Sequence, residues 1–146
     1  MKYLNKPVAY LVDSDIDKNG NLINPKIPKD IPVLIMIQAN FCGYCTIAKP
    51  DFQEFANENS HTYICATIQG DGDDQKLAKR ISKIYPNFQG YPSYIVYKDG
   101  KYLQDYQGER DKESLKKFVD SLWSLLSICL KNLKIFYSKD NFFFYN

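Results

Sequence analysis

The feature that most constrains this chain is a continuous apolar run, Val33 to Ile37, that leads within a few residues to two cysteines, Cys42 and Cys45. An unbroken apolar run of strand length predicts a central strand that is covered on both faces. From Gly43 the apolar spacing becomes helical, and the expected buried stripe consists of Ile47, Ala48, Phe52, Phe55 and Ala56. The cysteine pair is therefore expected where a buried strand gives way to a helix, which we expect to end near Asn59.

The rest of the chain alternates in the same way. Strands are predicted at Val8–Val12, Thr62–Ile68, Ser93–Tyr97 and Lys101–Tyr106, and helices at Asp73–Ile84 and from an N-cap at Asp111 to about Leu133. Asp99-Gly100 between the last two strands is a strong hairpin signal. This order predicts an α/β fold with a central mixed β-sheet flanked by helices.

Composition limits the function classes. A chain of 146 residues is enough for one domain, and 45% hydrophobic and 15% aromatic residues exclude intrinsic disorder. The 19 basic residues nearly balance the 17 acidic ones, so no nucleic-acid partner is expected. The longest uncharged run, Ile31 to Ala48, is interrupted by proline and polar residues, so we expect no membrane span.

The N-terminus lacks the apolar segment of a secretory signal, and no retention signal is found at the C-terminus. We therefore expect a cytoplasmic protein, with a virion or other particle left open as its location. Structural disulfides are rare in the cytosol, where a close cysteine pair more often has a catalytic or metal-binding role.

The spacing of Cys42 and Cys45 places both side chains on one helix face, near enough for a disulfide. The first cysteine lies where unpaired N–H groups and the positive helix end stabilise a thiolate, the attacking species in disulfide exchange. We predict that Cys42 attacks a substrate disulfide and Cys45 resolves the mixed disulfide. This chemistry requires no cofactor and no metal.

Several segments resemble the thioredoxin superfamily, which includes thioredoxins and protein disulfide isomerase domains. They are the strand and loop from Val33 to Cys45 with its Cys-Gly-Tyr-Cys motif, Pro50 in the following helix, Gly90-Tyr91-Pro92-Ser93, and the hairpin Tyr97–Lys101 with Tyr106-Gln107-Gly108. The resemblance covers Val8 to Trp123. It implies a thioredoxin-fold domain over residues 1–123, followed by a C-terminal extension over residues 124–146.

The resemblance also implies thiol–disulfide oxidoreductase activity on protein substrates that carry disulfides or thiols, with a separate reductase or oxidant as partner. Pro92 is expected in the cis form beside the dithiol. The expected substrate-binding residues are Phe41, Gly43, Tyr44, Tyr91 and Pro92.

Three departures leave the direction of electron transfer open. Met36 stands where thioredoxins have a buried Asp and isomerases a buried Glu, which helps to move the proton of the second cysteine. Deprotonation of Cys45 must then use water or another group, or be slow. Phe41 replaces the usual Trp, Gly43-Tyr44 matches neither subfamily, and Arg110 lies near the position of an arginine of the isomerases.

Other interpretations remain at this point. Cys42, Cys45, His61 and Cys65 have spacing near that of a zinc site, although His61 reads more simply as a polar strand-edge residue and Cys65 as a small buried one. The segment from Asp15 to Leu22 starts like a calcium loop but lacks the closing Glu, which favours a polar turn. A redox-inert binding or structural module, for example a particle component, is the alternative of a different class.

The apolar face predicted for the last helix consists of Leu115, Phe118, Val119, Leu122, Leu126, Cys129 and Leu133. Beyond Cys129 we expect an exposed apolar tail that includes residues 135–137 and 142–145. This tail either folds back, docks a partner or a second copy, or is a poorly ordered terminus.

Overall fold

The computed structural model describes residues 4–144 and contains one five-stranded sheet in the order β1-β3-β2-β4-β5. The strands are β1 (Ala9–Tyr10), β2 (Val33–Gln38), β3 (Ile64–Gln69), β4 (Ser93–Lys98) and β5 (Lys101–Tyr106). β1, β3 and β2 run parallel, whereas β4 and β5 continue the sheet in antiparallel pairings. The sheet is mixed, as predicted.

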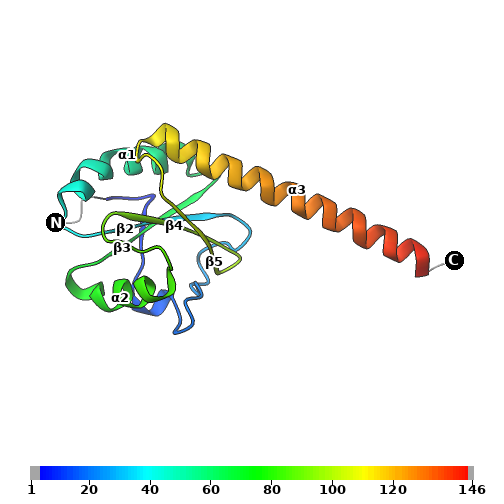
Figure 1. Cartoon of the computed structure of the whole chain (residues 1–146), viewed down its shortest axis with the longest axis horizontal. Helices are drawn as coiled ribbons and strands as arrows, with labels where there is room; N and C mark the ends of the chain where they lie inside the picture. The colour runs from blue at the N-terminus through cyan, green and yellow to red at the C-terminus, as the bar shows by residue number, and fades with distance from the viewer. Residues whose placement is uncertain (1–3, 145–146) are drawn as a thin grey trace.

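Three helices pack against this sheet, namely α1 (Gly43–Asn59), α2 (Gln75–Ile84) and α3 (Lys112–Phe144). α1 and α3 lie on one face and α2 lies on the other (Figure 1). Short 3₁₀ helices, η1 (Asp13–Asp15) and η2 (Gly72–Asp74), complete the order of elements. The α/β class and the helices flanking a mixed sheet agree with the prediction.

The sheet divides the interior into two apolar cores because alternate residues of each strand point to opposite faces. Leu34 and Met36 of β2 pack with Phe52 on the α1 side, whereas Ile35 and Ile37 pack with Leu77 on the α2 side. All six residues of β2 are buried. This is the two-sided burial that its continuous apolar sequence predicts, and β2 leads from this core to the exposed loop before α1.

Several predicted boundaries were wrong. The first strand is shorter than predicted, Thr62 lies in a turn before β3, and the second helix begins at Gln75 after η2. Ile47 was expected in the buried stripe of α1, but its side chain is 77% exposed. At 100° per residue, Ile47 lies on the opposite side of the helix from Phe52 and Ala56, and the helical period places it outside the core.

The first turn of α3 is capped by Asp111, whose carboxylate accepts a hydrogen bond from the Ser114 N–H at 3.1 Å. Leu115, Val119 and Leu122 are buried, and the helix then continues away from the body of the molecule (Figure 1). Large exposed apolar side chains follow, namely Leu125, Ile128, Leu130 and Leu133. The predicted tail side chains at 135–137 and 142–145 lie outside the described side chains, and none of the described helices has the length and apolarity needed to cross a membrane.

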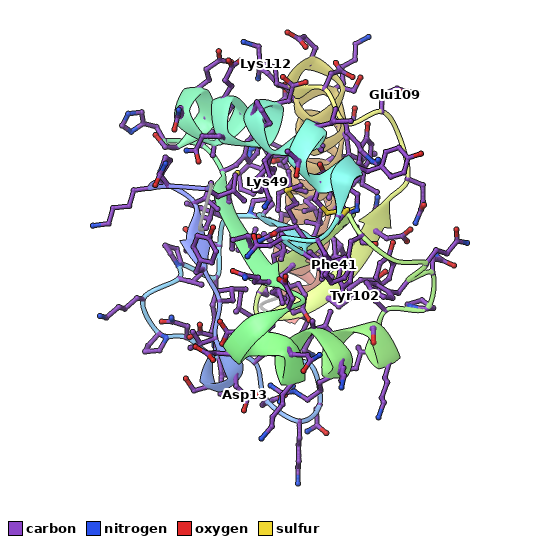
Figure 2. The ribbon with its side chains drawn as sticks, turned by 90° about the vertical axis from the view of Figure 1, so that its left-hand side faces the viewer. Asp13, Phe41, Lys49, Tyr102, Glu109 and Lys112 are labelled. Carbon is purple, nitrogen blue, oxygen red and sulfur yellow. A yellow bond between two sulfur atoms is a disulfide. The ribbon has the colours of Figure 1, made fainter. Side chains whose placement is uncertain are left out.

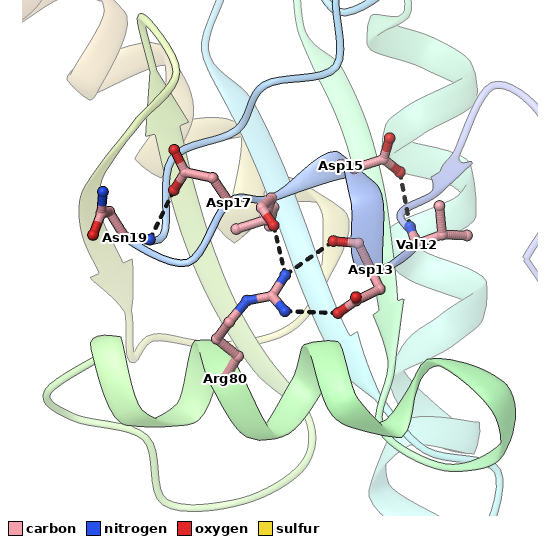
Figure 3. Close-up of polar contacts among 7 residues, drawn as sticks. Val12, Asp13, Asp15, Asp17, Asn19 and Arg80 are labelled. Atoms are coloured by element: carbon pink, nitrogen blue, oxygen red, sulfur yellow. Dashed lines mark hydrogen bonds and ion pairs between the residues drawn. The ribbon is translucent and has the colours of Figure 1, made fainter.

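The acidic segment after β1 forms a polar turn held to α2 rather than a cation loop. Asp17 accepts hydrogen bonds from the backbone N–H groups of Asn19 and Asn21, each at 2.9 Å. Arg80 of α2 donates to the Asp13 carboxylate at 2.7 Å and also to backbone carbonyls of this turn (Figure 3). The carboxylates of the calcium-like pattern therefore accept hydrogen bonds from backbone N–H and side-chain amide groups, as the polar-turn interpretation predicted.

Candidate active site

The two cysteines lie at the junction between β2 and α1. Cys42 and Cys45 form a disulfide, with their Cα atoms 5.2 Å apart (Figure 2). Cys42 is partly exposed, whereas Cys45 is fully buried at 0% exposure. A substrate in solution can therefore reach the first sulfur and not the second, which fits an attacking Cys42 and a resolving Cys45.

Cys42 is the N-cap residue of α1. Its Sγ accepts a hydrogen bond from the Cys45 backbone N–H at 3.1 Å. The first N–H groups of a helix have no partner within the helix, and the helix dipole is positive at that end. A thiolate at Cys42 would be stabilised by this same N–H group, so the local backbone favours the reactive form of the sulfur.

A second loop brings Tyr91 and Pro92 beside the dithiol. The Tyr91–Pro92 peptide bond is cis, as the family resemblance implied, and Pro92 is buried. The Tyr91 carbonyl oxygen lies 3.4 Å from Cys42 Sγ, within reach of a hydrogen bond from a reduced thiol. Gly90, directly before this loop, has φ +126°, a backbone conformation that residues with side chains rarely adopt. Glycine at this position therefore permits the backbone path into the loop.

Exposed apolar side chains flank Cys42 in the chain and form an apolar rim. Its members are Phe41, Tyr44 and Ile47, which are 74%, 70% and 77% exposed. The Phe41 ring meets the Tyr91 ring edge to face at 5.9 Å. The Arg110 guanidinium lies 5.9 Å from the centre of the Tyr44 ring. Of the predicted substrate-binding residues, Phe41, Gly43 and Tyr44 flank Cys42 in the chain, and the loop of Tyr91 and Pro92 meets them through Tyr91, which contacts both Phe41 and Cys42. Ile47 is a further exposed apolar side chain, which a stricter use of the helical period would have placed at the surface.

A buried lysine lies on α1 one turn after Cys45. Lys49 is only 4% exposed, and Met36, at the position of the family carboxylate, is fully buried. Burial lowers the pKa of Lys49, and the Asp71 carboxylate partly opposes this shift. The same Asp71 accepts hydrogen bonds from the Asn40 backbone N–H at 3.1 and 3.2 Å. Sequence reasoning missed Lys49, although its position four residues after Cys45 places both on one helix face.

The remaining cysteines and the histidine do not join the dithiol. Cys65 is 4% exposed, and burial raises the pKa of its thiol to about 12. His61 is exposed in the turn before β3, so its predicted place on the strand was wrong. Cys129 is exposed on α3. Among the described residues, no group of three or more His, Cys, Asp or Glu side chains is placed to hold a metal ion.

A dithiol at the start of α1, beside a cis-proline loop on a sheet flanked by helices, defines the thioredoxin class of proteins. The family model described as Thioredoxin matches residues 16–121. The chain belongs to this family.

Relatives from several organisms are similar to this chain. The thioredoxin-like protein 453L of Invertebrate iridescent virus 6 is 42% identical in an alignment of length 118 that covers 71% of this chain and 85% of the viral protein. A protein disulfide-isomerase A4 of Caenorhabditis elegans is 31% identical over 107 residues, covering 72% of this chain and 15% of that protein. This chain therefore spans most of the viral relative and a small part of the isomerase.

Solved structures show the same fold. The J-Trx1 fragment of ERdj5 has a TM-score of 0.54 and 25% identity, with 62% of this chain and 42% of that chain covered. Form II of human ERp44 has a TM-score of 0.60 and 15% identity, with 82% and 31% covered. Family membership and the paired cysteines together support a thiol–disulfide oxidoreductase function in general terms.

Proposed function

We propose that this protein exchanges thiols and disulfides with protein substrates through its Cys-Gly-Tyr-Cys dithiol, with Cys42 attacking and Cys45 resolving. The observation that carries the proposal is the difference between the two sulfurs at one helix start. Cys42 is reachable and caps α1 through its Sγ, whereas Cys45 is fully buried one turn inside the helix. An attacking sulfur requires access to substrate, and a resolving sulfur requires only access to its partner.

The reaction is a sequence of two exchanges. The Cys42 thiolate attacks one sulfur of a substrate disulfide, forms a mixed disulfide and releases the first substrate thiolate. Cys45 then attacks Cys42 Sγ, which forms the Cys42–Cys45 disulfide and releases the second substrate thiolate. Two electrons pass to the substrate, and a separate reductase must return the protein to the dithiol. The reverse sequence oxidises a substrate dithiol and requires a separate oxidant.

The surroundings of Cys42 support a protein chain as substrate. The exposed side chains of Phe41, Tyr44 and Ile47 offer apolar contacts to an unfolded or extended segment. The loop of Tyr91 and Pro92 lies beside Cys42, with the Tyr91 carbonyl oxygen 3.4 Å from Cys42 Sγ. We expect its backbone to receive the substrate chain as an added strand. We include all five predicted substrate-binding residues in this contact surface, together with Ile47.

The test is insulin reduction by the wild type and by Cys42→Ser and Cys45→Ser, each in a Cys129→Ser background that removes the exposed third thiol. We expect activity in the parent and background rates in both variants. Cys45→Ser should in addition accumulate mixed disulfides on Cys42, visible on non-reducing gels. Background activity of the parent would support a redox-inert binding or structural module instead, and trapping on Cys45 in Cys42→Ser would reverse the two roles.

A further inference from the structure

We propose that Lys49 accepts the proton of the Cys45 thiol when Cys45 resolves the mixed disulfide, the task for which this chain has no carboxylate at Met36. The inference rests on the proposed function, because it concerns the second of the two exchanges. It is carried by the placement of a buried amine on the same inward helix face as the resolving cysteine.

The position of Lys49 follows from helix geometry. Residues four apart on a helix are neighbours, and long side chains run back toward the helix N-terminus. The Lys49 stem therefore extends over the turn that contains Cys45, and both residues face the interior, with exposures of 4% and 0%. Figure 2 shows Lys49 toward the middle of the molecule, in contrast to Lys112 and Glu109 at its edge.

The ammonium end of Lys49 has an electrostatic partner in Asp71, which follows β3. Asp71 is itself held to the loop before Cys42 by the Asn40 N–H. Lys49 thus shares a helix face with the resolving cysteine and feels the charge of a carboxylate anchored to the active-site loop. Burial lowers the pKa of Lys49, which makes the neutral amine more accessible near neutral pH than for a lysine in water.

Other titratable groups in this core are poor proton acceptors. They are the buried Tyr63, Cys65 and Tyr94, with Tyr10 and Tyr106 at the margin. Burial raises the pKa of each of them, so they remain protonated at neutral pH. On α1 itself, Glu54 and Glu58 form ion pairs with Lys112 of α3. The negative charge of Asp51, also on α1, contributes to the raised pKa of Tyr94.

The proposed step balances without any added reagent. Cys45 Sγ attacks Cys42 Sγ in the mixed disulfide while the Cys45 S–H proton passes to the Lys49 amine. The Cys42–Cys45 bond forms as the bond from Cys42 to the substrate sulfur breaks, and the substrate leaves as a thiolate. The Lys49 ammonium then returns its proton to water or to the departing thiolate.

The step can be isolated with a small aromatic disulfide whose thiolate absorbs light. Mixing it with the reduced Cys129→Ser protein gives a first release when Cys42 attacks and a second when Cys45 closes the disulfide. We expect Lys49→Met to slow the second release about a hundredfold at neutral pH and to leave the first unchanged. The pH profile of the second release should also move to higher pH, a readout that a structural role of Lys49 would not produce.

Three variants separate the explanations. Lys49→Arg keeps the positive charge, but a guanidinium does not lose its proton in a protein. The second release should therefore be as slow in Lys49→Arg as in Lys49→Met. Asp71→Asn removes the charge that favours the ammonium form, so closure should become faster at neutral pH. Lys112→Met removes an outer lysine that also contacts α1, and it should match the parent in both releases.

The inference would be overturned if Lys49→Met gave the second release at the parent's rate across the pH range. It would also be overturned if Lys49→Arg restored that rate fully, or if Asp71→Asn made the second release slower. Absence of the first release in the parent protein would instead contradict the proposed function itself. Melting temperatures of the variants confirm that each is folded, and methionine at this buried position is expected to keep the packing of the lysine stem.

Discussion

Cys42 and Cys65 are residues of the same type in two different backbone environments. Cys42 follows β2, is partly exposed and caps a helix, and its Sγ accepts the Cys45 N–H. Cys65 lies within β3, pairs in register with Leu34 of β2 and is 4% exposed. Burial raises the pKa of the Cys65 thiol to about 12, because an apolar core stabilises the neutral form.

The comparison shows that backbone position, more than residue type, decides what a thiol can do. At the end of a strand and the start of a helix, N–H groups remain free to stabilise a negative sulfur. Within a central strand those groups belong to the sheet ladder, and neighbouring side chains exclude water. The same fold therefore provides a reactive thiol and an inert one.

The largest expected difference is in alkylation. At pH 8, in the reduced native protein, we expect Cys42 to react about a thousandfold or more faster than Cys65, because the buried thiol is almost entirely protonated. Mass spectrometry of timed iodoacetamide reactions measures both rates. Comparable alkylation rates of Cys42 and Cys65 in the folded protein would contradict the comparison. In denaturant the two thiols should react at equal rates, which serves as the control.

A negative charge placed at position 65 or at position 42 should sharpen the comparison of the two environments. Cys65→Asp buries an unpaired carboxylate between the sheet and α1, and we expect it to lower the free energy of unfolding by more than about 3 kcal/mol. Urea denaturation under reducing conditions measures this loss. Cys65→Ala is the matched control and should lose no more than about 2 kcal/mol. A Cys65→Asp variant as stable as the alanine variant would show that water reaches this site.

At position 42 the same charge should be tolerated. Asp is a favoured N-cap residue, so in the reduced protein Cys42→Asp should be about 1 kcal/mol more stable than Cys42→Ala. The comparison is made by denaturation with Cys45→Ser in both variants, which removes the disulfide. If alanine proves equal or better, then the cap hydrogen bond from the Cys45 N–H contributes little.

The smallest expected effect on stability concerns the rim around Cys42. Ile47→Ser should change the free energy of unfolding by less than about 0.5 kcal/mol, because its side chain is already exposed. In the insulin assay the same variant should raise the KM severalfold and leave the reaction with a small disulfide unchanged. A large loss of stability would show that Ile47 packs on the protein, and an unchanged KM would remove it from the substrate contact.

The sequence predicted most of what depends on local pattern. The continuous apolar run became β2, the change of period marked the start of α1, and Cys65 was correctly interpreted as a small buried residue. The cis form of the Tyr91–Pro92 bond followed from resemblance to a family and not from local physics. The helix from Asp111 was found through its cap and its apolar stripe.

What escaped prediction depends on tertiary packing. The apolar side chain of Ile47 predicts a core position, whereas its angle on α1 directs it to solvent. Lys49 was overlooked because lysines are rarely buried, and only the folded chain brings Asp71 near its ammonium group. Contacts between segments far apart in sequence, such as Asn40 with Asp71, have no local signal.

The central claim, that Cys42 and Cys45 form a working redox pair, is tested most directly by the reduction potential of their disulfide. The protein, as Cys129→Ser, is equilibrated with glutathione buffers of known ratio, and the dithiol fraction is measured. The account predicts a potential between about −270 and −120 mV, the range of exchange-active dithiols in this fold. A value below about −300 mV would mark a structural disulfide and contradict the account.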